Sequence, residues 1–190
     1  MTGVVARIER AVEVTGRVVN GVSDTGWRTA TPCAPWDVHT VLNHVVGGMH
    51  IVAALLNGAD PGRAHEDDWL GEDPEAAYAA AAEADLAAWT RPGALDATVR
   101  LSFGALPGPF AALVHLTEVC VHGADIAVAT GAQSLLDEDL CDHLLTAMRN
   151  TPGFDSFRAP GFFGPETPAP ADAPPHTRLL AFLGRPAGAG

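Results

Sequence analysis

Apolar residues recur at helical spacing along most of this chain. The spacing is that of one helix face, and Gly or Pro residues interrupt it between successive stretches. Six stretches carry the pattern: residues 3–22, 36–56, 74–89, 110–130, 135–149 and 176–183. The pattern predicts a helix in each of them, and the first four are long enough to pack along one another.

The segments between these stretches are predicted to be short or irregular. Residues 97–103 alternate apolar and polar side chains, which predicts one short extended segment, and residues 104–109 are predicted as a loop. The acidic residues 58–73 also form a loop, and the Pro-, Gly- and Ala-rich residues 151–175 lie extended over the surface. The expected fold is all-α, a four-helix bundle with an extended segment and a C-terminal helix, in a single domain over residues 1–190.

The fourth long helix carries the most informative polar residues. On a helical wheel His115, Glu118, His122 and Asp125 share one narrow stripe, and most of the remaining surface is apolar. Such a helix is expected to be buried, and buried ionisable side chains are costly unless they are paired or bind a metal. Glu-x-x-x-His places a carboxylate and an imidazole one turn apart, which suits a divalent cation. Gly131 is expected to end the helix.

A metal site needs a further ligand from another helix. The second long helix contains His39, His44 and His50. His44 lies deep in an apolar run, and Gly47 and Gly48 beside it are expected to leave room for a metal or ligand. His39 lies nearer the start of the helix, and His50 is rotated about 240° from His44. His44 is therefore the chosen ligand.

Composition excludes several other functions. The formal net charge of −12 argues against nucleic acid or an anionic membrane surface as a partner. All 11 basic residues are arginines, so Schiff-base chemistry and a phosphate-loop lysine are excluded. Three cysteines without a Cys-x-x-Cys pair predict neither a disulfide framework nor a cysteine zinc site. We find no signal-peptide pattern and no membrane-length apolar run, so we expect a cytoplasmic protein.

Longer motifs resemble a known superfamily. They are Thr31–Val38 (TPCAPWDV), Leu42–Gly48 (LNHVVGG), Glu118–Ala127 (EVCVHGADIA) and a tail from Phe163 to Arg185. Together they resemble the DinB-like metal-binding superfamily, in the actinobacterial branch around the mycothiol-dependent maleylpyruvate isomerases. The resemblance covers nearly the whole chain in the same order.

The resemblance implies a four-helix bundle with a His, carboxylate, His metal triad, which falls on His44, Glu118 and His122. It also implies a metal- and thiol-dependent transferase or isomerase that acts on a small-molecule substrate with a low-molecular-weight thiol, mycothiol, as co-substrate. Zinc is favoured on frequency, and nickel, iron and manganese suit the same donors. His115 is a candidate proton shuttle or a histidine without a role. Asp125 either orients a ligand imidazole or is a helix-surface acid.

Two other functions remain open: a non-catalytic, stress-associated metal-binding bundle, and a structural protein whose polar stripe is a closed hydrogen-bond network. The sequence predicts no particular oligomeric state. Cys33 is interpreted as a packing residue rather than a reactive thiol, Trp36 as a hydrophobic anchor, and residues 66–73 as a solvated loop. Three arginines are candidates for clamping an anionic substrate: Arg100, Arg178 and Arg185.

Overall fold

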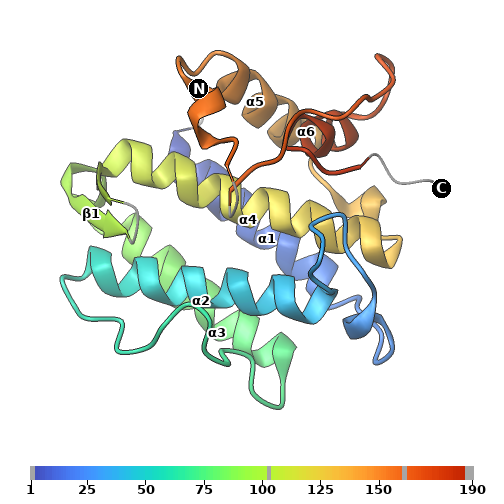
Figure 1. Cartoon of the computed structure of the whole chain (residues 1–190). Coiled ribbons are helices and arrows are strands. Elements are labelled where there is room, and N and C mark those ends of the chain that lie inside the picture. The colour runs from blue at the N-terminus through green and yellow to red at the C-terminus, as the bar shows by residue number, and fades with distance from the viewer. Residues whose placement is uncertain (1–2, 102–103, 160–161, 187–190) are drawn as a thin grey trace.

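A computed structural model describes residues 3–101, 104–159 and 162–186. Helices dominate this part of the chain (Figure 1). The α-helices within it are α1 (Val4–Val19), α2 (Val38–Leu56), α3 (Pro74–Thr90), α4 (Gly108–Thr130), α5 (Glu138–Arg149) and α6 (Pro175–Phe182). Their ends agree with the sequence prediction to within three residues, and the all-α fold class is confirmed.

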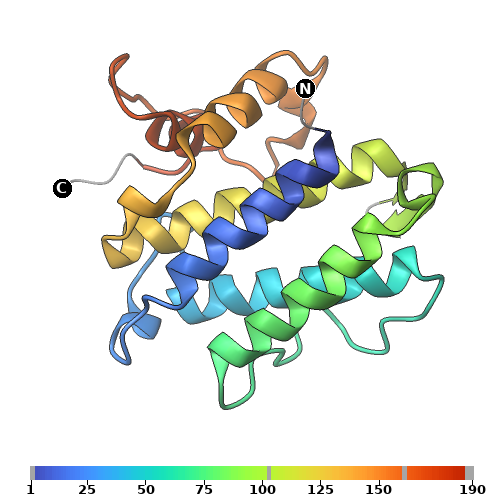
Figure 2. The ribbon, with the colours of Figure 1, turned by 180° about the vertical axis from the view of Figure 1, so that it is seen from behind.

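The first four α-helices form the bundle. Helix α1 packs against α3 and α4, and α2 packs against the same two helices on the other side (Figures 1 and 2). Helices α5 and α6 pack on each other, and α6 also contacts α4, so the C-terminal part covers the face of α4 turned away from α2. One hydrophobic core joins all of these helices, with members such as Val12, Leu42, Ala81, Leu116, Leu144 and Leu179.

Local signals set the helix ends. Asp37, Asp73 and Asp137 each accept a hydrogen bond from a backbone N–H in the first turn of α2, α3 and α5, at 2.8, 3.0 and 3.0 Å. These side chains satisfy N–H groups that have no partner within the helix. The second helix was predicted to start near Trp36–Asp37, and because Asp37 is its cap, α2 begins one residue later at Val38. Gly131 ends α4 at a φ of 74°, as expected for a left-handed cap.

The prediction of a loop at residues 104–109 was wrong. Gly104–Pro107 form strand β2, which pairs antiparallel with β1 (Thr98–Leu101), and α4 begins directly afterwards at Gly108. The short segment has Gly and Pro at its ends and no alternation of its own, so its strand conformation depends on hydrogen bonds to β1. Residues 102 and 103 of the predicted extended segment lie outside the described residues.

Helices α2 and α4 are long and apolar enough to cross a membrane by length and composition alone, so the prediction of no membrane-length apolar run was wrong. Inside the bundle, 78% of the most apolar window of α4 and 50% of that of α2 are buried. Their apolar character is therefore accounted for by the core of the bundle.

Candidate metal centre

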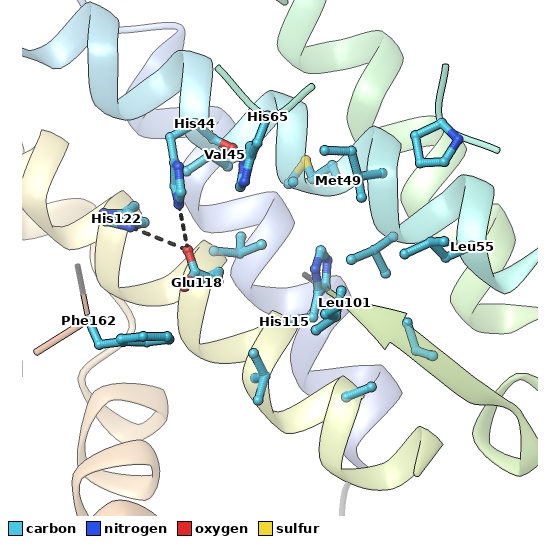
Figure 3. Close-up of a pocket in the computed structure, with 18 of the residues that line it drawn as sticks. His44, Val45, Met49, Leu55, His65, Leu101, His115, Glu118, His122 and Phe162 are labelled. Carbon is cyan, nitrogen blue, oxygen red and sulfur yellow. Dashed lines mark hydrogen bonds and ion pairs between the residues drawn. The ribbon is translucent and has the colours of Figure 1, made fainter. Parts of the chain in front are cut away.

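Three predicted donors meet between α2 and α4. His44 Nε2 lies 3.1 Å from Glu118 Oε2, and His122 Nε2 lies 3.4 Å from the same oxygen (Figure 3). One donor atom from each residue lies within 4.8 Å of the other two. Glu118 and His122 are four residues apart on one face of α4, and the packing of α2 on α4 brings His44 opposite them.

Asp125 holds the other side of the His122 ring. Its Oδ2 accepts a hydrogen bond from His122 Nδ1 at 3.1 Å, which leaves Nε2 directed at Glu118. Asp125 is 0% exposed, so the alternative of a helix-surface acid was wrong. Its charge is balanced by the buried Arg185, whose Nε donates to both carboxylate oxygens at 2.8 and 3.0 Å.

A second group of possible ligands lies on this far side of the ring. It consists of Cys33, His122 and Asp125. Arg185 also donates from Nη2 to Cys33 Sγ at 3.4 Å, so a guanidinium already occupies the position beside both acceptors. Its positive charge opposes a cation there. The group formed by His44, Glu118 and His122 therefore suits a metal better.

The electrostatics of that group favour a cation. Burial raises the pKa of Glu118, but hydrogen bonds from His122 and His44 outweigh it and hold the pKa well below its usual range. Burial lowers the pKa of His44, which favours its neutral imidazole. Burial also lowers the pKa of His122, yet hydrogen bonds with Asp125, Cys33 and Glu118 raise it well above the ordinary value. A metal would therefore replace a proton on His122.

Two aromatic side chains near His44 were not predicted as part of the site. The His65 ring stacks on His44 with centroids 4.1 Å apart, and its Nε2 donates to the His44 carbonyl at 2.8 Å. Trp36 lies 4.9 Å from His44 and 6.0 Å from His122, ring centroid to ring centroid. Trp36 is thus more than an anchor for the helix start, because it borders both imidazoles.

The loop that carries His65 is partly buried, so the prediction that residues 66–73 form a solvated loop was wrong in part. Leu70 is buried, and the Trp69 ring packs against α2 at Gly47. A Cβ atom at Gly47 would lie 2.7 Å from that ring, and one at Gly48 would lie 3.5 Å from His65. The space beside Gly47 is therefore filled by Trp69, where a metal or ligand was expected, whereas Gly48 lines the pocket as predicted. The sequence pattern of this loop gave no signal for its packing, because the packing depends on a tertiary contact with α2.

His115 is buried one turn along α4 from Glu118, and it lines a pocket that also contains the three donors. Its Nε2 lies 2.8 Å from Oδ2 of Asp85 on α3, and its ring centroid is 5.6 Å from that of Trp89. Sequence reasoning missed Asp85. The available signal was its position on the buried face of α3, in register with Tyr78 and Trp89.

The three candidate arginines have different surroundings in the structure. Arg178 pairs with Asp142 at 3.1 Å, and Arg185 pairs with Asp125. Arg100 lines the pocket from β1 and forms no ion pair with any described residue. Cys33 packs against the hydrophobic core, as interpreted from the sequence, and also lines the pocket.

A pocket of about 690 Å³ extends from the three donors. In Figure 3 His44, Glu118 and His122 lie at one end, and Met49, Leu101 and Leu55 lie progressively further away. A donor group that faces such a space leaves coordination positions open toward a ligand, as in catalytic sites.

Fold and donors define a helical bundle with a candidate metal centre between two of its helices. Residues 8–127 match the family model of the mycothiol maleylpyruvate isomerase N-terminal domain. The chain belongs to this family, which is part of the DinB-like superfamily, and the predicted resemblance is confirmed.

Two curated relatives come from Mycobacterium tuberculosis. Uncharacterized protein Rv0738 (strain ATCC 25618 / H37Rv) and Uncharacterized protein MT0763 (strain CDC 1551 / Oshkosh) are each 36% identical to this chain over 156 residues. The similarity covers 82% of this chain and 82% of each relative. No solved structure matches.

Proposed function

We propose that this protein binds a divalent metal ion through His44, Glu118 and His122 and acts as a thiol-dependent transferase or isomerase. The observation that carries the proposal is the convergence of the three donor atoms within 4.8 Å at the end of a pocket. The family match supports a mycothiol-type thiol as co-substrate. We also propose a cytoplasmic location, where such thiols are kept reduced.

The donor set fits the metal. Two imidazoles and one carboxylate suit zinc, and also nickel, iron and manganese. When bound, the metal would supply a Lewis acid that activates a thiol and polarises a substrate carbonyl. Asp125 orients His122 by holding Nδ1, and the His65 ring restricts the orientation of His44 by stacking on it.

His115 is proposed to move the proton of the reaction. It is the nearest pocket-lining imidazole along α4 outside the donor group, three residues from Glu118. The Asp85 carboxylate fixes the ring through Nε2. An imidazole held in one orientation beside a reacting group is suited to general acid–base catalysis.

The test is metal content followed by thiol chemistry. Wild-type protein without a histidine tag is compared with His122→Ala and with His39→Ala, a control histidine of α2 outside the donor group. We expect near-stoichiometric metal in the wild type and control, and its loss in His122→Ala. Absence of metal from the wild type after reloading with zinc would overturn the proposal in favour of a structural network.

Thiol dependence is then measured on the metal-loaded protein with mycothiol and a panel of electrophiles. We expect consumption of thiol that requires the metal and falls in His115→Gln. Stoichiometric metal without any thiol binding or turnover would identify the alternative, a non-catalytic metal-binding bundle.

A further inference from the structure

The two ends of the pocket differ in polarity. One end carries the metal donors, and the rest is lined mainly by side chains from α2, α4 and β1. We call this second part the apolar arm and define it by Met49, Val52, Leu55, Leu101, Ala111 and Val114. All six side chains are hydrocarbon or thioether groups.

The arm is long. Leu55 lies eleven residues beyond His44 on α2, and Ala111 lies eleven residues before His122 on α4. Each interval spans about 16 Å at the rise of an α-helix. Figure 3 shows the labelled Met49, Leu101 and Leu55 leading away from the donors in that direction. The space is therefore larger than a compact polar substrate at the donors would fill.

Three ionisable residues line the pocket away from the donors: His115, Glu66 and Arg100. His115 pairs through Nε2 with Asp85 and lies one turn from Glu118, where the arm meets the donors. Glu66 and Arg100 are both exposed to solvent. Between the six apolar side chains a charged group would lose its hydration, whereas an apolar group would leave water favourably.

We propose that the apolar arm binds an alkyl or aryl group of the substrate or thiol whose reacting end lies at the metal donors. This rests on the proposed function, and it names the substrate class: an amphipathic molecule with a polar reactive head and an apolar tail. The division of the pocket into donors and arm carries the inference.

The test is a homologous series of ligands. Ethanethiol, propanethiol, butanethiol, pentanethiol and hexanethiol are titrated into zinc-loaded protein by calorimetry. If each added methylene enters the arm, the dissociation constant should fall about fourfold per carbon. The same titrations with the corresponding alcohols, and with metal-free protein, separate the contribution of the tail from that of the thiol.

A matched pair of variants locates the tail. Val114→Asp places a carboxylate in the arm at a half-buried position, and Val128→Asp makes the same change elsewhere on α4, outside the pocket lining. We expect Val114→Asp to remove the dependence on chain length and Val128→Asp to keep it. Circular dichroism and zinc content of both variants establish that each is folded and loaded.

The outcomes distinguish the two proposals. Thiols that bind zinc-loaded protein with no dependence on length overturn the apolar arm and leave the proposed function intact. Length-dependent binding that is equal for alcohols and for metal-free protein upholds the arm and overturns the thiol function. An unchanged length dependence in Val114→Asp overturns the placement of the tail, and an absence of any binding overturns both.

Discussion

Asp85 of α3 and His115 of α4 form a buried pair between two helices of the bundle. The carboxylate is 0% exposed and the imidazole 4%, with 2.8 Å between Oδ2 and Nε2. Within the described part of the chain, Oδ1 of Asp85 and the indole nitrogen of Trp89 have no hydrogen-bond partner. Among the described residues, the pair therefore supplies the one hydrogen bond found for this carboxylate, and it fixes the His115 ring beside the pocket.

Replacing Asp85 with Ala should destabilise the protein by about 1–3 kcal/mol, because it leaves a buried nitrogen of His115 without its hydrogen-bond partner. Glu83→Ala removes an exposed acid from the same helix and should change the unfolding free energy by less than about 0.5 kcal/mol. Urea unfolding at neutral pH measures both. Equal stabilities for the two variants would mean that the Asp85–His115 contact is energetically neutral.

Most residues of the centre were predicted from spacing within one helix, and His44 of α2 was chosen from its place in an apolar run and from the family resemblance. Glu118, His122 and Asp125 were identified because helical spacing alone places them on one stripe, and the structure brings their atoms together. Asp85 was missed because its partner lies on another helix. Spacing within α3 predicts the buried face but not what that face meets.

The same reason explains the other differences. His65 reaches the site from a loop whose acidic composition predicted solvation, and only tertiary packing of Trp69 on Gly47 shows otherwise. Strand β2 likewise depends on a partner, because its strand conformation is stabilised by pairing with β1. Elements with their own strong periodicity were predicted well, and segments that depend on a distant partner were not.

The two adjacent glycines of α2 should respond to substitution with opposite signs. Gly47→Ala brings a Cβ atom to 2.7 Å from the Trp69 ring, which overpacks the contact and should cost about 1–3 kcal/mol. Gly48→Ala meets its nearest neighbour, His65, at an ordinary 3.5 Å, so helix propensity dominates and stability should rise by about 0.5–1 kcal/mol. Thermal unfolding compares them, and a stabilised Gly47→Ala would contradict the docking of the loop.

Asp125→Asn should weaken metal binding without removing a ligand. The amide preserves the shape but not the charge that orients His122, and loss of such a partner typically lowers metal affinity about 10–100-fold. Stability should also fall, because Arg185 stays buried with its counter-charge gone. Zinc affinity is measured by chelator competition, with Asp142→Asn as the control, a surface acid paired with Arg178. Unaltered zinc affinity in Asp125→Asn would rule out its orienting role.

Asp137 should make stability depend on pH in the acid range. It caps α5 and pairs with Arg10 of α1, Nε to Oδ2, at 2.7 Å. Burial raises its pKa, but the Arg10 hydrogen bond and the Leu140 backbone N–H lower it below the ordinary value. The folded state therefore binds fewer protons than the unfolded state as the carboxyl titrates.

That difference fixes the sign of the effect. The stabilisation from the Asp137 charge is fully present above the pKa of the unfolded carboxyl, about 3.9, and is lost as the pH falls through the lower folded pKa. Asp137→Asn keeps a capping side chain, so it should be less stable than the wild type by about 1 kcal/mol at pH 7, with the gap closing on acidification. Arg10→Gln should behave similarly, whereas Arg17→Gln, which breaks an exposed pair with Glu13, should not. Urea unfolding at a series of pH values measures the gap, and a gap that stays constant down to the lowest pH would refute the assignment to this pair.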